Sequence, residues 1–496
     1  MCGIIGGVCK NNITPILIDG LKRLEYRGYD SAGVVVLGAD KQLARARSVG
    51  KVVNLEDNIT GKKRHLTGAI GIAHTRWATH GEPSSRNAHP HICNNSVSVV
   101  HNGIIENFLK LKTQQQKQGY NFTSDTDTEV IAHGIDQALQ QDISLLEATQ
   151  KMLKTLKGAY AIGVVSAKHP EHLIAARSGS VLVIGISKQG NFIASDPMAL
   201  LDITNNFIYL EEGDIADICL DSISIYDENG KPVERQIKTS KLKPGQISKG
   251  DFAHFMHKEI FEQPQAIRDT LESRISKNSV LLAAFGPDSS AVFDKIQQVQ
   301  IIACGTSYHA GLVAKYWLED IAKIPCHIEV ASEYRYRHPL ILDDTLFVTI
   351  SQSGETADTL EALKTVKKHQ PNIHTLSICN SPESSLTRES ELVFLTHAGV
   401  EIGVASTKAF TTQLVSLALL TVAIGKVKKT LNQAQEALIV DGLSRLPGLI
   451  EKTLKQENRI IKLAQTFKNK SNALFLGRGT MHAIAMEGAL KLKEIR

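Results

Sequence analysis

The sequence predicts an α+β domain of sandwiched antiparallel sheets followed by doubly wound α/β structure. Residues 1–240 contain many short strand-like runs with turn residues between them, such as CGIIGGV, SAGVVVL and VSVVHNGII. Strands outnumber helices in this part, which favours packed antiparallel sheets. Beyond residue 252, apolar runs that end in glycine and serine alternate with helical segments, as in VQIIACGTS and TLFVTISQSGET. This repeated order of strand, small-residue turn and helix is typical of a parallel α/β sheet.

Composition narrows the class of protein. The 496 residues suffice for two or three domains that each bury a core. The net charge of +5 includes no block of lysine and arginine, so we expect no nucleic-acid partner. The seven cysteines are scattered and form no CxxC, which argues against both a disulfide framework and a zinc site. Because no secretory signal is visible either, we expect a cytoplasmic protein.

Changes of pattern place the expected domain limits and three local elements. The first domain is expected at 1–240, a linker at 241–252, a second domain at 253–430, and the beginning of a further α/β module at 431–496. The local expectations are a helix over 124–140, a helix pair over 252–275 that is interrupted at Pro264, and a buried helix over 410–425. The last run is too short and too polar at its start to span a bilayer, so we expect no membrane contact.

An internal repeat lies near the end of the chain. VQIIACGTSYHAG, at 299–311, is similar to NALFLGRGTMHAI, at 472–484: an apolar strand is followed by Gly-Thr and His-Ala at the start of a helix. The two copies begin about 173 residues apart. A second copy as long as the first extends well past residue 496. We therefore expect the second α/β module to be incomplete, with apolar surface exposed around 440–496.

Cys2 is the first candidate for chemistry. When the initiator methionine is removed, Cys2 carries both a thiol and the free α-amine of the chain. An α-amine with a pKa near 8 is able to act as general base for its own residue's thiol, which activates the sulfur as a nucleophile. The alternative is a buried cysteine that acts as a small hydrophobe in a strand.

Three further segments of the first domain carry polar groups suited to a substrate. In HTRWATHG (74–81), Arg76 is suited to hold a carboxylate and Trp77 to cover a site, although an ordinary salt bridge at a strand end is the alternative. Asn102 and Gly103 follow a strand and offer the N–H groups of an oxyanion hole, or else form a plain Asn-Gly hairpin turn. Asp127 is able to bind an ammonium, unless it only caps a helix.

The second half contains two similar turns and one charged pair. CGTS (304–307) and SQSGET (351–356) each follow a strand and open a helix, so their N–H and hydroxyl groups suit a phosphate; capping by serine is the alternative. Neither turn is a Walker loop or a GxGxxG. Lys491 and Glu494 share one helix face, and such a pair is able to move a proton between adjacent sugar carbons, or is a surface ion pair. The histidines around HPH (89–91) suggest a metal, but no second motif accompanies them, and we expect hydrogen-bonded structural residues.

Taken in order, MCGIIG, RGYDSAG (27–33), HTRWATHG, HNGIIEN and SDTDTE closely resemble the glutaminase domain of the N-terminal-nucleophile amidotransferases. Together with the later motifs, the whole chain is similar to the glucosamine-6-phosphate synthase family. The resemblance implies that Cys2 attacks the side-chain amide of L-glutamine and that Asn102 and Gly103 stabilise the oxyanion. It further implies five residues that bind or enclose glutamine, with the tryptophan also gating the passage of ammonia: Arg76, Trp77, Thr79, His80 and Asp127.

The resemblance also implies sugar-isomerase modules that bind D-fructose 6-phosphate and release D-glucosamine 6-phosphate, without metal or organic cofactor, in a homodimer. The implied acid/base is Glu494, with Lys491 beside it. The implied sugar-phosphate ligands are Gly305, Thr306, Ser307, Ser351, Gln352, Ser353 and Thr356, with Ser406 close by.

Three hypotheses follow. The first is the complete reaction, in which glutamine nitrogen aminates and isomerises fructose 6-phosphate. The second is a glutaminase whose synthase half is inactive, because the family continues past the KLKEI run through a second isomerase module with residues that have no counterpart here. This hypothesis predicts little or no glucosamine 6-phosphate. The third is a sugar-phosphate sensor, against which Cys2, Arg76 and Asp127 argue because a sensor needs no nucleophile.

Overall fold

The computed structural model describes residues 2–25, 28–61, 66–77, 81–240, 249–382 and 384–495. The chain forms two compact units, Met1–Ile247 and Ser248–Arg496, and each is described by itself.

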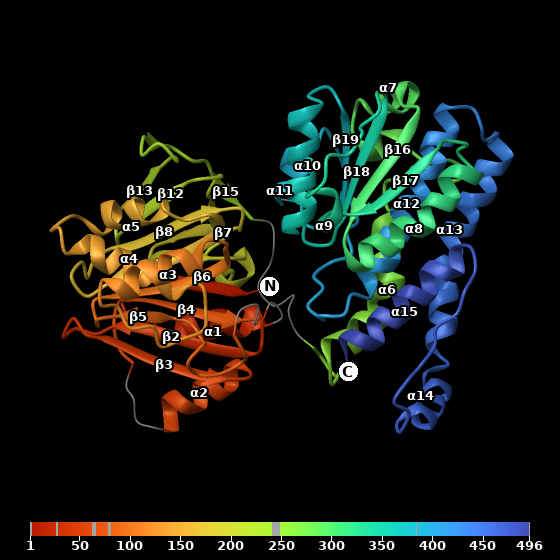
Figure 1. The fold of residues 1–496 in the computed structure, drawn as a ribbon. Coiled ribbons are helices and arrows are strands. Elements are labelled where there is room, and N and C mark those ends of the chain that lie inside the picture. The colour runs from red at the N-terminus through yellow and green to blue at the C-terminus, as the bar shows by residue number, and fades with distance from the viewer. Residues whose placement is uncertain are drawn as a thin grey trace. The chain divides into compact units, whose positions relative to one another are not determined.

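Two antiparallel sheets form the first unit (Figure 1). The eight-stranded sheet has the order β15-β11-β9-β10-β1-β4-β2-β3, and the seven-stranded sheet has the order β14-β13-β12-β8-β7-β6-β5. The strands of the first sheet are β1 (Gly3–Cys9), β2 (Ser31–Leu37), β3 (Leu43–Val49), β4 (Ile70–Arg76), β9 (Val183–Ser187), β10 (Gly190–Ala194), β11 (Asn206–Tyr209) and β15 (Ile237–Thr239). Those of the second are β5 (His91–Cys93), β6 (Val97–Ile105), β7 (Gly158–Ser166), β8 (Leu173–Ser178), β12 (Ile215–Ile218), β13 (Ile223–Tyr226) and β14 (Pro232–Val233).

The sheets pack face to face, and helices cover their outer faces. Ile72 and Ile193 of the first sheet and Val100 and Ala161 of the second belong to one buried cluster. On the other face of the second sheet, Ile162 packs in a cluster with helix residues. The helices are α1 (Thr14–Leu24) against β1 and β4, α2 (Val52–Gly61) against β3, α3 (Phe108–Lys117) against α4, and α4 (Glu129–Leu139) with α5 (Leu145–Leu153) against the second sheet. The predicted sandwich of antiparallel sheets is therefore confirmed.

The second unit is built on a parallel sheet of order β17-β16-β18-β19-β20 (Figure 1). Its strands are β16 (Gln298–Ala303), β17 (Cys326–Val330), β18 (Thr345–Ser351), β19 (His374–Cys379) and β20 (Leu392–Leu395). One face packs in a buried cluster with α6 (Phe255–Leu271), α7 (Ser289–Lys295), α8 (Gly305–Asp320), α12 (Lys408–Val427) and α13 (Gln433–Leu454). The other packs with α9 (Ala331–Tyr334), α10 (Ala357–His369) and α11 (Ser385–Glu389). The chain then forms α14 (Glu457–Phe467) and α15 (Thr480–Glu494).

Helix α12 contains the apolar run expected to be a buried helix. By length and composition it is the one helix of the described residues that is apolar enough to cross a membrane, but 67% of its most apolar window is buried inside the structure. It packs against α6 and α8. The expectation of a buried core helix is confirmed.

One expected helix forms but starts later than predicted, and two other local expectations are wrong. The helix expected at 124–140 begins at Glu129, because the Glu129 carboxylate accepts from the N–H groups of Thr123 and Ser124 and holds them in a turn. Pro264 does not divide α6. Because a proline has no N–H to donate to the carbonyl four residues earlier, the Ile260 carbonyl accepts instead from the Gln263 side-chain amide at 2.9 Å.

The apolar strand expected in the second repeat does not form. Residues 473–478 have no regular structure, although α15 follows them as expected. Leu474 and Leu476 are 89% and 86% exposed. A strand needs a neighbour for its backbone groups, and the parallel sheet of the described residues ends at β17 and β20 without including this segment.

A group of buried histidines lies close together in the first unit. His74, His89, His91 and His101 are all at most 5% exposed, and the rings of His74 and His89 are 4.3 Å apart. Burial lowers the pKa of His74 to about 3 and holds the pKa of His89 and His91 well below the usual value. Neighbouring charges of Arg45, Arg47 and Arg76 add to the effect at His91. All three rings are therefore neutral at pH 7.

These histidines make the folded unit sensitive to acid. Because the unfolded chain binds protons on His91 below about pH 6.5 and the folded chain does not, the free energy of unfolding falls as the pH drops below that value. In His91→Gln, whose amide still reaches the Thr126 hydroxyl, we expect the slope of unfolding free energy against pH to fall by about 1.4 kcal/mol per pH unit. Denaturant titrations between about pH 6 and about pH 5 measure it. Equal slopes there for the two proteins contradict a neutral His91, and slopes that coincide above about pH 7.5 are the internal control.

Candidate functional site

A small pocket opens at the start of β1. It is lined by residues from five segments of the first unit: Cys2, Arg76, Trp77, His89, His101, Gly103, Thr126, Asp127 and Thr128. Strand β1 is hydrogen-bonded on both sides, to β4 and to β10, with Gly3 paired to Thr75 and Ile5 to Ala194. The residue that precedes this strand is thereby held at one edge of the sandwich, and that residue is Cys2.

The thiol of Cys2 lies against the backbone of Trp77. The Trp77 N–H donates to Sγ at 3.2 Å, and Sγ lies 3.6 Å from the Trp77 carbonyl. The sulfur is therefore held between the N–H donor and the carbonyl acceptor of one residue. The Trp77 ring is 36% exposed and stands edge-on to Tyr29, with centroids 5.4 Å apart. The structure therefore brings Cys2 and Trp77 together, while Thr79, His80 and Arg27 lie outside the described residues.

The orientation of the Asn102 amide follows from the protonation of His74. The Nε2 atom of His74 lies 3.1 Å from the His101 carbonyl and 3.0 Å from Asn102 Oδ1, which are both acceptors. Because the ring is neutral, its single N–H must be on Nε2, where it donates to them. Asn102 consequently directs its NH2 group to the other side, where Nδ2 donates to the Cys2 carbonyl at 3.1 Å. His74 was not among the predicted site residues.

Asn102 and Gly103 lie within strand β6 and do not form a hairpin turn. They pair with Ala161 and Tyr160 of β7. Gly103 has φ +133°, and a Cβ there would lie 2.0 Å from the carbonyl oxygen of Ala159. No other residue fits this position without displacing β7, so glycine is required by the close approach of two backbones.

Asp127 connects the loop before α4 to the end of β6. Its Oδ2 accepts from the Ile105 N–H at 2.7 Å, and it is 5% exposed. Helix α4 has Thr128 at its N-cap, so Asp127 is not the capping residue. Arg76 donates to the carbonyls of Gly81 and Glu82. Burial lowers the pKa of Arg76, whereas the neighbouring charges of Cys2, Asp30 and Asp127 act to raise it, so the pocket places a cation beside the Asp127 carboxylate.

In the second unit, the candidate phosphate turns lie at adjacent strand ends. Strand β16 lies beside β18 in the sheet. After β16 the chain continues to β17 on one side, and after β18 it continues to β19 on the other side, so the switch point of this doubly wound sheet lies between β16 and β18. Gly305, Thr306 and Ser307 open α8 directly after β16. Ser351 ends β18, and Gln352, Ser353 and Thr356 lead into α10. The structure therefore brings the two turns together at the edge where such folds bind ligands (Figure 1).

The turn after β18 is held by its own hydroxyl groups. Ser351 Oγ accepts from the Gly354 N–H at 3.0 Å and lies 3.1 Å from Thr356 Oγ1. Ser353 Oγ accepts from the Glu355 N–H. Gly354 has φ +67°, and a Cβ there would lie 2.0 Å from Ser384 Oγ. The turn is thus closed by hydrogen bonds and by contact with the next loop.

The Ser406 hydroxyl has a hydrogen-bond partner within this chain. Its hydroxyl donates to the Glu401 carboxylate at 2.9 Å. The same carboxylate accepts from the N–H groups of Thr407 and Ala409 at the start of α12. A buried carboxylate of this chain therefore already occupies the N-terminus of this helix.

A network of charged side chains joins α15 to α8. The Glu487 carboxylate accepts from His309 Nδ1 at 2.7 Å and from the Thr306 hydroxyl at 2.9 Å. Lys491 Nζ donates to Thr306 Oγ1 at 2.9 Å and to Glu494 Oε2 at 2.5 Å. Burial acts to raise the pKa of Glu487, but the His309 hydrogen bond, the Lys491 charge and the Thr306 hydrogen bond leave it lowered overall.

This network contains two residues that sequence reasoning missed, Glu487 and His309. The available signal was Glu487 four residues before Lys491, on the same helix face. The pair Lys491–Glu494 is present as predicted and is linked through Thr306 to the predicted phosphate turn, so it is more than a surface ion pair.

Comparisons with known proteins identify a domain family in each unit. A family model described as "Glutamine amidotransferase domain" matches residues 74–202, and one described as "SIS domain" matches residues 293–423. A solved structure from Francisella tularensis, a C-terminal domain of glucosamine-fructose-6-phosphate aminotransferase, is 49% identical, covers 50% of this chain and 70% of its own, and has a TM-score of 0.49.

Curated relatives match the whole chain. The proteins from Pseudomonas putida and Pseudomonas aeruginosa, both named glutamine–fructose-6-phosphate aminotransferase [isomerizing], are 54% identical over 495 residues, which is 100% of this chain and 80% of each relative. The protein of the same name from Acinetobacter baylyi is 52% identical over 499 residues, 100% of this chain and 81% of that relative. The chain belongs to the family of the isomerizing glutamine–fructose-6-phosphate aminotransferases.

Proposed function

We propose that this chain uses L-glutamine to convert D-fructose 6-phosphate into D-glucosamine 6-phosphate. The observation that carries the proposal is the pocket at Cys2, where a thiol, a guanidinium and a carboxylate converge and the Asn102 amide is bonded to the Cys2 carbonyl. The second unit supports it with two phosphate-type turns at the switch point of its sheet. The chain belongs to a family whose members are named for a reaction that combines glutamine with fructose 6-phosphate, which links the site of the first unit to that of the second.

In the first step, the Cys2 thiolate attacks the side-chain amide carbon of glutamine. The α-amine of Cys2 accepts the thiol proton and returns it to the leaving ammonia, and water then hydrolyses the thioester. Arg76 holds the substrate carboxylate, Asp127 holds its ammonium, and Trp77, Thr79 and His80 enclose it. The Asn102 amide and the Gly103 N–H stabilise the oxyanion.

In the second step, ammonia replaces the carbonyl oxygen of the ketose, and a proton moves from C1 to C2. Thr306 and Ser307 with Ser351, Gln352, Ser353 and Thr356 hold the sugar phosphate at the starts of α8 and α10, with Gly305 allowing a close approach of the backbone. Ser406 supports this site through Glu401. Glu494 moves the proton, and Lys491 holds its carboxylate.

The proposal also covers the domain limits, the location and the oligomeric state of the enzyme. We place the limits of its domains at 1–240, 253–430 and 431–496, with a linker at 241–252. It works as a cytoplasmic homodimer without a nucleic-acid partner and needs no organic cofactor. A glutaminase that lacks the synthase reaction is not favoured, because the relatives that match the chain over all of its length are named for the complete reaction.

Replacing Cys2 separates the two halves of the reaction. We expect Cys2→Ala to lower glutamine hydrolysis by at least about a thousandfold, since the nucleophile is lost, while formation of glucosamine 6-phosphate from ammonia persists. Glutamate and glucosamine 6-phosphate are measured separately, with Cys9→Ala, at the far end of β1, as the matched control. Hydrolysis retained in Cys2→Ala contradicts the nucleophile. Hydrolysis by the parent without any sugar product supports the glutaminase alternative.

His74 acts through Asn102 and is a positioning residue. In His74→Phe the amide of Asn102 loses the donor that orients it, so we expect kcat for glutamine hydrolysis to fall about 10- to 100-fold with little change in KM. His74→Gln keeps a donor in the same direction and is the matched control, expected to restore most of the activity. The idea fails if the two variants lose kcat equally.

Glu487 holds His309, Thr306 and Lys491 in place for the sugar step. We expect Glu487→Gln to lower the rate of glucosamine 6-phosphate formation about tenfold or more, because the neutral amide no longer compensates Lys491, while glutamine hydrolysis is retained. Glu436→Gln, at another buried carboxylate bonded to a lysine, is the control and is expected to leave the rate unchanged. A sugar rate in Glu487→Gln equal to that of the parent rejects this role.

A further inference from the structure

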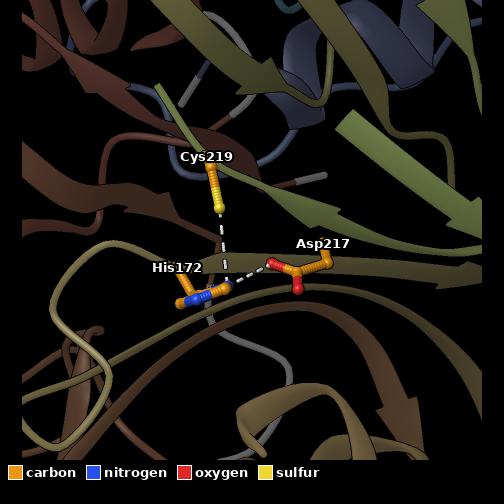
Figure 2. A group of neighbouring side chains, drawn as sticks. All are labelled: His172, Asp217 and Cys219. Carbon is orange, nitrogen blue, oxygen red and sulfur yellow. Dashed lines mark hydrogen bonds and ion pairs between the residues drawn. The ribbon is translucent and has the colours of Figure 1, made fainter. Parts of the chain in front are cut away.

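A cluster of three different ligand-type side chains lies in the first unit, apart from the glutamine pocket. His172 precedes β8, Asp217 lies in β12, and Cys219 follows β12 (Figure 2). His172 Nδ1 lies 2.8 Å from Asp217 Oδ1 and 3.5 Å from Cys219 Sγ. The three ligand atoms are all within 4.8 Å of one another.

Sheet register explains why these residues meet. Strands β12 and β8 are antiparallel, with Asp217 opposite Ile174 and Ile218 opposite Leu173. The next step of this register places Cys219 opposite His172. Side chains alternate along a strand, so Asp217 and Cys219 share one face of the sheet, and His172 joins them from the neighbouring strand.

The backbone around the cluster is held in place. The Cys219 N–H donates to the Ser222 carbonyl, which closes the turn between β12 and β13. Asn191, which is 6% exposed, donates from Nδ2 to the carbonyls of Cys219 and Leu220. The His172 N–H donates to the His169 carbonyl. Ligand positions that are fixed before an ion arrives lower the cost of binding it.

The arrangement suits an ion better than a proton relay. In a relay the imidazole uses one nitrogen for the nucleophile and the other for the carboxylate, whereas here both the sulfur and the oxygen face the same nitrogen, Nδ1 (Figure 2). Around a tetrahedral Zn²⁺, ligand atoms lie roughly 3.3–3.6 Å apart. The nitrogen–sulfur distance already matches, and the nitrogen–oxygen distance needs to open by only about 0.5 Å.

We propose that His172, Asp217 and Cys219 bind one divalent ion of the zinc class, a site the sequence analysis did not expect. A thiolate with an imidazole selects Zn²⁺ and its softer neighbours over Mg²⁺ and Ca²⁺. The side chains of His172 and Asp217 are 39% and 20% exposed, so the ion has a path from solvent, which also supplies a water as fourth ligand.

The site lies apart from the residues of glutamine hydrolysis and does not take part in that reaction. In the second sheet, Asn102 of β6 lies opposite Ala161 of β7, and Ala161 lies opposite Arg177 of β8. The cluster lies at the other end of β8, next to Leu173. Four residues of strand are about 13 Å. The bound ion therefore joins the start of β8 to the turn after β12 and stabilises the first unit, while the reaction at Cys2 proceeds without it.

The test is a Co²⁺ titration of the full chain in the Cys2→Ala background, which removes another accessible thiol. We expect one Co²⁺ per chain, a thiolate-to-cobalt absorption band, displacement by Zn²⁺ but not by Mg²⁺, and a raised melting temperature of the first unit. Cys219→Ser is expected to abolish the band, and Asp217→Asn to weaken binding about tenfold or more. Cys304→Ser, at another half-buried cysteine, is the matched control and is expected to bind as the parent does.

Glutamine hydrolysis by Cys219→Ser with Cys2 intact shows that this variant folds, and we expect it to equal the parent. The proposal is overturned if the parent shows no thiolate band, if Co²⁺ binds equally well to Cys219→Ser, or if Mg²⁺ displaces it. If the three side chains only form hydrogen bonds with one another and bind no ion, the parent shows no thiolate band.

Discussion

The pairing of β1 on both of its edges is the constraint on which the first site depends. A terminus ordinarily frays, but Gly3 to Cys9 lie inside an eight-stranded sheet, and Ile4 and Ile5 are fully buried. The strand reaches this position because its glycines admit close neighbours: a Cβ on Gly3 would lie 2.6 Å from Thr75 Oγ1, and one on Gly7 would lie 2.4 Å from the Phe192 ring. The conformational entropy of Cys2 is therefore lost on folding, and the thiol is already in place when a substrate arrives.

A second constraint is the exclusion of water from the interior of the first unit. It determines the protonation and the hydrogen bonding of the polar groups at that site. Because His74 is too buried to be protonated, it has a single N–H, and the two acceptors beside Nε2 determine where that N–H lies. The Asn102 amide then has one orientation in which both of its ends are bonded. The same burial makes the unit sensitive to acid, so the precision of the site and its acid sensitivity have one physical cause.

Local patterns predicted what is decided locally. The sandwich, the alternating strands and helices, and the turns after β16 and β18 follow from periodicity and from small residues at strand ends. Errors arose where a distant or unexpected partner decides: Gln263 satisfies the carbonyl that Pro264 leaves open, and residues 473–478 lack a neighbouring strand. Glu487 and His309 are 178 residues apart in the sequence, and His172 is 47 residues from Cys219. Only the packing of α15 on α8 and the register of β8 with β12 bring these pairs together.

The charge balance of the candidate sugar-phosphate site depends on which helix N-termini have no carboxylate of this chain bound to them and can therefore bind a ligand. Three helices begin near the candidate sugar-phosphate residues, and each start carries a partial positive charge. At α12 the Glu401 carboxylate already accepts from two of the first N–H groups. The N-cap side chains of α8 and α10, Cys304 and Thr356, make no capping hydrogen bond. Two helix starts at one switch point, each worth about half a charge, are suited to a dianionic phosphate without a dedicated lysine, and this leaves Lys491 to hold the carboxylate of Glu494.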